Sequence, residues 1–379
     1  MAEALPHRRP AAQRAFTAAT LAALLCAMLA LVAGWPRGEP RAMSAALAPA
    51  ALAADAEGYL QALEPRVFTF PDDHAAHPGY RTEWWYLTGN LQTVTGRRFG
   101  YQVTLFRRGL SPQPAERASH WGTGAMYFAH IGLSDASTRR FHSAERYARD
   151  ALALAGADTD GFWIGDWAVS GTPDSGMDLR VTADAFSLAF RIEPGALVLR
   201  GHDGLSAKSA AAGNNSYYFA APRLETDGTI KLGGQEHAVK GQSWFDREWS
   251  SSALDRQQTG WDWIAVHLDD GRDLMLFQLR AADGRRDFAA AEISDATGGR
   301  RQLDADEITL EPVQWWRSDA SGHRYPIRWR VAVAELGLSG ELRAVFPDQE
   351  HRGDFRYWEG MVDLKGSHPG HGYLEMTGY

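Results

Sequence analysis

The sequence predicts an all-β protein built as a sandwich or a barrel. Short runs of alternating polar and apolar residues recur through the body of the chain, and turns rich in Gly and Asp separate them about every ten residues. Beyond residue 58 we find no long stretch with the 3.6-residue period of an amphipathic helix. Hydrophobic residues make up 45% of the 379 residues, which is ordinary for a globular protein and excludes bulk disorder.

The N-terminal segment has the pattern of an export signal. The 22 residues from Ala15 to Pro36 carry no charge, and Arg8, Arg9 and Arg14 precede them. A run of this length is also just long enough to span a bilayer as a helix. A cleaved signal, with Ala51-Leu52-Ala53 as a candidate cleavage site, and an uncleaved anchor therefore both remain open. In either case we expect an exported body that is periplasmic or membrane-anchored.

The cysteine content indicates the compartment of the protein, and the net charge argues against one class of partner. The single cysteine, Cys26, lies in the apolar run after Leu25, and a lipoprotein acylation site needs a small residue there. A cysteine-free body suits an oxidising compartment. The net charge of −8 argues against nucleic acid as a partner.

Composition also predicts the domain boundaries. Residues 37–58 are rich in Ala, Pro and Arg and resemble a linker, and residues 201–241 are rich in Gly, Ala and Asn. We therefore predict an export signal or anchor with a linker over residues 1–54, an N-terminal β domain over 55–238 and a C-terminal β domain over 239–379.

The clearest strands can be placed individually. Residues 99–106 and 181–190 alternate as strands do, and residues 261–268 and 273–280 flank an Asp-Asp-Gly turn in a pattern typical of a hairpin.

The stretch from Trp244 to Trp249 combines Trp with carboxylates. If it is extended, Trp244, Asp246 and Glu248 share one face, while Phe245, Arg247 and Trp249 share the other. Carboxylates among Trp side chains tend to be desolvated, which raises their pKa and makes them candidate proton donors near neutral pH. The alternative is a surface ion pair between either carboxylate and a neighbouring Arg.

Asp262 stands out within its predicted strand, because it shares a face with Ile264, Val266 and Leu268. An acid on an apolar face costs several kcal/mol unless it is paired or neutral. It is therefore a candidate catalytic acid, or an Asp at the start of a strand that binds loop N–H groups.

The first half of the chain contains a similar stretch from Glu83 to Gly89. Glu83 is a candidate pocket residue or the centre of a structural hydrogen-bond network, and Trp84, Trp85 and Tyr86 are candidate wall residues. His130 alternates with aromatic residues, which fits a core histidine or a ligand contact. We expect no metal, since the His residues lack a convincing set of ligands, and no cofactor, since no phosphate-binding or dinucleotide-binding motif is present.

These motifs together resemble a known family. The stretches 83–89, 216–219, 244–249, 260–263 and 372–379, in this order, resemble the lipocalin-like family that includes carotenoid 1,2-hydratases, many of whose bacterial members are labelled predicted secreted hydrolases. The resemblance covers about residues 60–379. It implies two lipocalin-like β-barrels side by side, with a ligand site in a barrel interior or at the junction. It also implies an ABC-transporter permease as a possible partner.

The resemblance implies acid-catalysed hydration of an isoprenoid or lipid-like molecule, or its hydrolysis. Asp246 and Asp262 match the family's acidic positions, although the family's carotenoid hydratases carry His-rich versions of the segment where this chain has Arg247 and Glu248, which puts a carotenoid substrate in doubt. We predict catalytic roles for Asp262, Asp246, Glu248 and Glu83. The predicted ligand-binding residues are Trp84, Trp85, Tyr86, Trp244, Trp249, Trp261, Trp263 and His130. The alternatives are a non-catalytic envelope carrier working with a transporter and a secreted glycosidase with an open, polar pocket.

Overall fold

The structure is a computed structural model that describes residues 57–113, 119–210, 213–252, 254–255, 257–303 and 305–379. The export segment and linker predicted for residues 1–54 lie outside the described residues. Within the described ranges we find no helix with the length and apolar character that a membrane crossing requires.

Helical structure in the described ranges is confined to single 3-10 turns, which are η1 (Asp72–His74), η2 (Ala151–Ala153), η3 (Ala305–Glu307) and η4 (Ala334–Leu336).

The strands form two antiparallel sheets. The first sheet contains β1 (Thr82–Gln92), β2 (Arg98–Gly109), β3 (Ala125–Asp135), β4 (Arg140–Arg149), β5 (Ala155–Asp158), β6 (Gly161–Ile164), β7 (Trp167–Thr172), β8 (Gly176–Thr182), β9 (Phe186–Ile192), β10 (Val198–Leu199), β11 (Leu205–Ala207), β12 (Asn215–Leu232) and β13 (Gln235–Ser250). The second contains β14 (Gln258–Leu268), β15 (Asp273–Ala281), β16 (Arg286–Ser294), β17 (Arg300–Leu303), β18 (Ile308–Arg317), β19 (Arg324–Val333), β20 (Leu338–Ala344), β21 (Glu350–Arg352), β22 (Arg356–Gly366) and β23 (Gly370–Met376).

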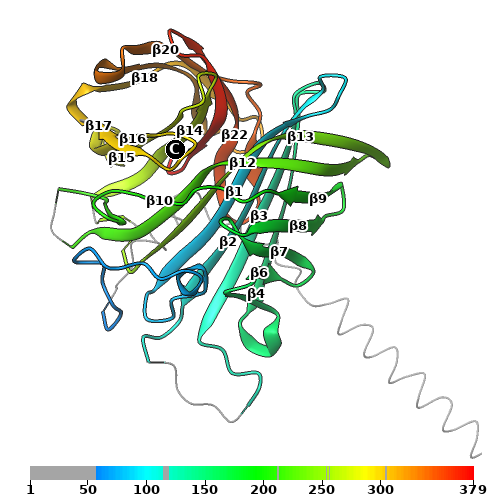
Figure 1. Cartoon of the computed structure of the whole chain (residues 1–379), viewed down its shortest axis with the longest axis vertical. Helices are drawn as coiled ribbons and strands as arrows, with labels where there is room; N and C mark the ends of the chain where they lie inside the picture. Colours follow the sequence, from blue (N-terminus) through cyan, green and yellow to red (C-terminus); the bar gives the residue numbers. More distant parts are fainter. Residues whose placement is uncertain (1–56, 114–118, 211–212, 253, 256, 304) are drawn as a thin grey trace, which may run out of the picture. The chain divides into compact units, whose positions relative to one another are not determined.

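Neighbouring strands follow the order β4-β3-β2-β1-β13-β12-β9-β8-β7-β6-β5 in the first sheet and β17-β16-β15-β14-β23-β22-β20-β19-β18 in the second. One sheet is a nearly closed barrel and the other is a half-barrel. Figure 1 shows the strands of the second sheet curling round on themselves. The predicted all-β fold of two lipocalin-like domains is thus confirmed.

Two sequence predictions need adjustment. The run predicted over residues 181–190 is divided by a turn between β8 and β9. The domain boundary predicted between residues 238 and 239 falls inside β13, which pairs with β12 on one side and, from Lys240 to Ser250, with β1 on the other. The chain passes from the first sheet to the second between β13 and β14, after Ser250. The hairpin predicted over residues 261–280 is present as β14 and β15.

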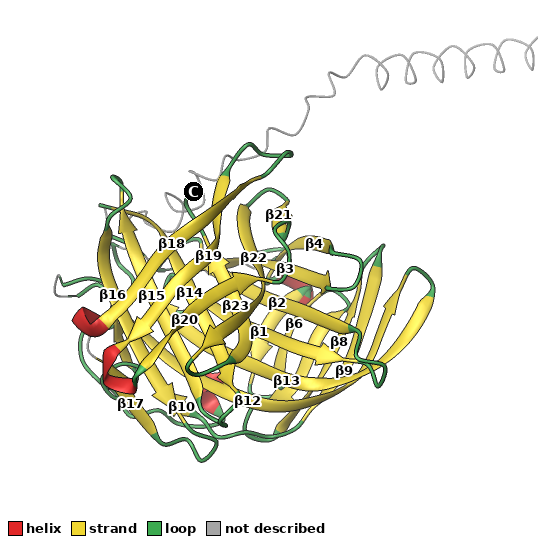
Figure 2. Cartoon of the chain, turned by 90° about the horizontal axis from the view of Figure 1, so that it is seen from above, coloured by secondary structure: helices red, strands yellow, loops and turns green. Residues whose placement is uncertain are grey.

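Strand alternation gives the molecule three hydrophobic cores. One lies within each sheet, and the third joins the two sheets, where β1 of the first sheet runs beside β23 of the second (Figure 2). We call this junction the seam. Residues of the seam include Tyr86, Trp244, Trp263, Met361 and Tyr373. Because each strand presents alternate side chains to opposite faces, every strand at the seam supplies one face to it and one face to its own core.

Candidate functional site

A pocket opens within the seam, between the sheets rather than inside either barrel. The free space between its side chains has a volume of about 90 Å³, and the pocket is partly open to solvent. Its lining consists mainly of aromatic side chains, with acidic groups among them: Trp84, Tyr86, Thr104, Phe106, Lys208, Tyr218, Asp246, Glu248, Trp261, Trp263, Phe277, Leu279, Tyr357, Glu359 and Glu375. A lining that is mainly aromatic, with a few polar groups among it, is typical of sites that bind small apolar molecules.

The faces predicted from alternation are confirmed. On β13, Asp246 and Glu248 point into the pocket, whereas Phe245 and Trp249 pack in the core of the first sheet. A one-residue shift in register would exchange the two sets. The face of β13 that enters the pocket therefore follows from the pairing of this strand with β1.

Two further carboxyl groups, Glu359 and Glu375, lie directly opposite each other on β22 and β23. Burial raises the pKa of Glu359 well above its usual value, and repulsion from Glu375 adds to this effect. Burial likewise raises the pKa of Glu375 to about 8, although a hydrogen bond from Trp261 opposes the change. The Tyr86 hydroxyl donates a hydrogen bond to Oε1 of Glu359. The pair can therefore retain protons at neutral pH.

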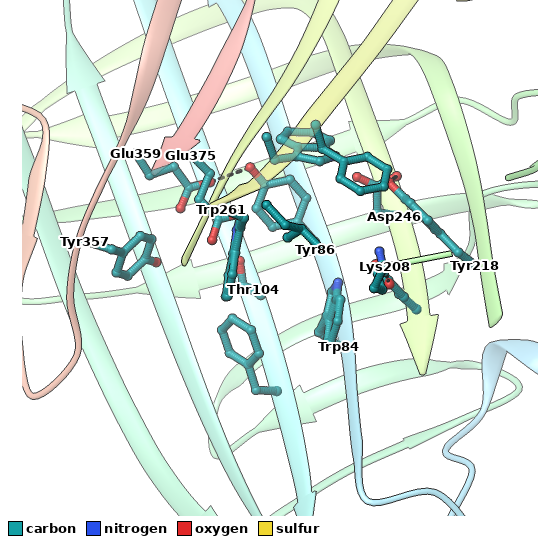
Figure 3. Close-up of a pocket in the computed structure, with 15 residues that line it drawn as sticks. Trp84, Tyr86, Thr104, Lys208, Tyr218, Asp246, Trp261, Tyr357, Glu359 and Glu375 are labelled. Carbon is teal, nitrogen blue, oxygen red and sulfur yellow. Dashed lines mark hydrogen bonds and ion pairs between the residues drawn. The ribbon is translucent and has the colours of Figure 1, made fainter. Parts of the chain in front are cut away.

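Asp246 occupies the other side of the pocket. Burial raises its pKa to about 7, against the opposing charge of Arg200. Trp244 Nε1 and the Tyr218 hydroxyl each donate a hydrogen bond of 2.9 Å to Oδ1, which leaves Oδ2 as the oxygen for an exchangeable proton. Figure 3 shows Asp246 and Tyr218 on one side of the pocket and the pair of Glu359 and Glu375 on the other.

Glu248 is placed in the pocket wall as an ion pair. Its Oε1 lies 2.6 Å from Nζ of Lys208 and accepts a hydrogen bond from Ser216. The Lys208 ammonium in turn lies over the rings of Tyr218 and Phe277, 5.4 and 4.8 Å from their centroids. Glu248 therefore lines the pocket, but its carboxylate is paired with the Lys208 ammonium. Asp246, Glu359 and Glu375 differ from it because burial raises their pKa values.

Glu83 does not reach the pocket. Its side chain points into the first sheet and forms ion pairs with Arg247 and Arg107, while the His77 backbone N–H also donates to it. Burial alone would raise the pKa of Glu83, but these partners lower it to about 2. A carboxylate held ionised in this way cannot donate a proton near neutral pH. The structural-network interpretation of Glu83 thus matches its surroundings.

Asp262 lies inside the second barrel, as its strand face predicts, and not among the pocket carboxyls. Its Oδ2 accepts hydrogen bonds from Gln278 (2.8 Å) and Arg280 (3.1 Å), and its Oδ1 accepts one from the Tyr379 hydroxyl (2.7 Å). The four carboxylates predicted to be catalytic do not share one cavity: Asp246 and Glu248 line the pocket, whereas Glu83 and Asp262 each face the core of their own sheet. Asp262 instead holds β14 in place, and that strand carries Trp261 and Trp263 into the pocket.

Asp262→Asn should therefore act on stability rather than on the pocket. The substitution preserves shape but leaves Arg280 without its buried carboxylate, so we expect the free energy of unfolding to fall by about 3–5 kcal/mol. Denaturant unfolding measures this loss, and the affinity of the folded protein for an apolar fluorescent probe should stay within about twofold. A stable variant with a weakened pocket would assign Asp262 to the site instead.

The predicted ligand-binding residues divide into two groups. Trp84, Tyr86, Trp261 and Trp263 line the pocket. The other four lie behind or beside its wall: Trp85 and Trp249 in the first core, Trp244 beneath Asp246, and His130 with Nδ1 3.1 Å from the hydroxyl of the lining residue Tyr357. Burial lowers the pKa of His130 to about 4, so this residue is neutral near pH 7.

Sequence reasoning missed the pair Glu359 and Glu375, together with Lys208, Tyr218 and Tyr357. The signal that singled out Asp262 is also present around Glu359, an acid in the apolar stretch from Trp358 to Val362. Alternation alone does not show that two such acids come from adjacent strands, because that depends on the pairing of β22 with β23. The described residues contain no group of three or more His, Cys, Asp and Glu placed to hold a metal ion.

Comparisons with known proteins agree with this architecture. Residues 61–379 match the family model described as AttH-like. The crystal structure of a protein assigned as an AttH from Nitrosomonas europaea is 35% identical, with a TM-score of 0.77, over 84% of this chain and 99% of the other. The crystal structure of kievitone hydratase from Nectria haematococca is 15% identical, with a TM-score of 0.63, over 85% of this chain and 96% of the other, and shows a shared fold. No curated protein sequence matches this chain.

Proposed function

We propose that this chain, which belongs to the AttH-like family, adds water across a carbon–carbon double bond of an apolar isoprenoid or lipid-like molecule. The observation that supports this proposal is the seam pocket, where aromatic walls surround carboxyl groups whose pKa values are raised into the neutral range. The walls offer an apolar skeleton a matching surface. Their ring faces would also stabilise a carbocation by cation–π contact, worth up to about 2 kcal/mol each when desolvated.

In the proposed reaction, Glu375 is the acid and Asp246 is the base. The protonated carboxyl of Glu375 transfers its proton to one alkene carbon, where the π electrons form the new C–H bond and leave a cation on the adjacent carbon. A water oxygen attacks that cation, and its surplus proton passes to the Asp246 carboxylate. Proton exchange with solvent then restores both groups. The two pKa values, about 8 and about 7, suit this division at neutral pH.

The two alternative functions, a glycosidase and a non-catalytic carrier, would each require a pocket of a different character. A glycosidase needs an open, polar groove, whereas the lining here is mainly aromatic. A carrier requires aromatic walls to bind an apolar ligand, but binding alone does not require carboxyl groups of raised pKa. One structural relative is named as a hydratase, so the fold can house such an activity. Export across the cytoplasmic membrane and a transporter partner remain proposals that rest on the N-terminal sequence and on the resemblance.

Incubation with a panel of isoprenoid alkenes in heavy-oxygen water tests the reaction. We expect mass spectrometry to find an alcohol that carries the labelled oxygen. Asp246→Asn should lower the rate roughly 100-fold, the usual contribution of general acid–base catalysis. Asp273→Asn is the matched control, because Asp273 is a buried carboxyl of raised pKa that pairs with Arg223 outside the pocket. Tight binding of alkenes without any incorporated label would favour the carrier.

A further inference from the structure

The loops at one end of the seam expose large apolar side chains. Leu60, Leu63, Leu110 and Trp121 are 60%, 59%, 53% and 65% exposed. We call these four residues the apolar rim. Most large apolar side chains of a soluble domain are buried, and an exposed group of them marks a contact with another protein or with a membrane.

Hydrogen bonds attach the rim segments to neighbouring parts of the fold. The Asn215 side chain donates to the carbonyl of Ala62 (3.0 Å), and the Ser251 hydroxyl donates to the carbonyl of Leu60. The backbone N–H of Leu110 donates to the carbonyl of Gly124 (3.0 Å), and that of Gly122, next to Trp121, donates to the carbonyl of Ser119 (2.9 Å). The rim is thus part of the folded body.

The rim also lies at the end of the seam where the pocket is found. Trp84 of the pocket lies near the start of β1, and Phe106 lies near the end of β2. Leu110 of the rim directly follows the last residue of β2. The backbone N–H of Lys208, another pocket residue, donates to Asn214, whose side chain accepts a hydrogen bond from Ser252 beside the rim. The turn between β1 and β2, which carries Val94, lies at the opposite end of these strands (Figure 1).

We propose that the apolar rim rests on the surface of a lipid bilayer and that the pocket receives its apolar ligand from that bilayer. Two observations select a membrane over a protein partner. The chain that leads into the rim is preceded by the charge-free run Ala15–Pro36, which is long enough to span a bilayer. The rim is composed of Leu and Trp, side chains that suit the boundary between acyl chains and headgroups. This inference rests on the proposed function for the nature of the ligand.

The two ends of β2 supply a matched experiment on the full-length chain. In a Cys26→Ser background, a single cysteine at Leu110→Cys or at Val94→Cys carries an environment-sensitive dye. These sites flank one strand of twelve residues, so the dyes are about 40 Å apart. The protein is reconstituted into phosphatidylethanolamine and phosphatidylglycerol vesicles that contain nitroxide-labelled lipid.

We expect the dye at position 110 to be quenched at least threefold more strongly than the dye at position 94. Trp121→Ser with Leu63→Ser should abolish the difference, whereas Trp315→Ser, at an exposed Trp on β18 of the second sheet, should leave it unchanged. Equal quenching at both sites, or quenching at neither, overturns the proposal. Such a result would leave hydration of detergent-dispersed alkenes intact, so it is distinguishable from a failure of the proposed function.

Discussion

Glu375→Gln should lower the turnover of an alkene substrate by roughly 100-fold or more while the protein remains folded. Gln keeps the shape of the side chain, but its amide N–H groups are far too weakly acidic to protonate an alkene. In the wild type, activity requires protonated Glu375 and ionised Asp246, so kcat/KM should peak between about pH 7 and pH 8. Rate measurements across this range check the assignment, because Asp246→Asn should remove the acidic limb of the profile.

Glu375→Gln should also change how the free energy of unfolding depends on pH. The pKa of Glu375 is raised from 4.5 to about 8 on folding, so the folded state binds the proton more tightly than the unfolded state. Its contribution to stability is therefore fully present below about pH 4.5 and is lost as the pH rises towards 8. Glu375→Gln should thus gain stability relative to wild type between pH 5 and pH 9.

Glu350→Gln is a suitable control for both measurements. Glu350 is buried in the same sheet but accepts hydrogen bonds from Ser318, Ser321 and Tyr325, away from the pocket. We expect it to lower stability without changing turnover per folded molecule. Full activity in Glu375→Gln, or an equal loss in Glu350→Gln, would remove Glu375 from the proposed role.

The contrast between Asp246 and Asp262 shows how far sequence reasoning extends. Alternation correctly assigned both to strand faces, because a strand's period is a local property. Whether a face borders a pocket or a core depends on which strand pairs beside it and how the two sheets pack. Asp246 faces the seam, whereas Asp262 meets Arg280 and Tyr379 inside the barrel. The ten residues on either side of each acid therefore do not show whether its side chain faces the pocket or a core.

The surroundings of Glu83 illustrate the same limit. Its partners Arg107 and Arg247 come from β2 and β13, which flank β1 on either side. The local sequence showed an acid next to two Trp residues, which is compatible with a pocket and with a buried ion pair. Only the order of strands distinguishes them.

Arg247→Met should destabilise the fold by about 3–5 kcal/mol, because it leaves the buried Glu83 carboxylate without its main partner. Arg247 is 0% exposed, and its guanidinium lies 3.8 Å from the ring centroid of Trp85 and 5.0 Å from that of Trp249. Denaturant unfolding at pH 7 measures the loss. The low pKa of Glu83, about 2, means that its wild-type contribution is present above about pH 4.5 and is lost as the pH falls towards 2. The difference between variant and wild type should therefore shrink in acid.

A double-mutant cycle separates the ion pair from the loss of packing around Arg247. Arg247→Met combined with Glu83→Gln should be more stable than Arg247→Met alone, because the second change removes the buried Glu83 charge that Arg247 no longer balances. Arg330→Met is the control for the loss of an arginine: its pair with Glu311 is exposed at the surface and should contribute no more than about 1 kcal/mol. Strictly additive losses at Arg247 and Glu83 would show that the two groups do not interact energetically. In that case β13, which presents Asp246 to the pocket, would depend on its apolar neighbours and its backbone pairing for its position.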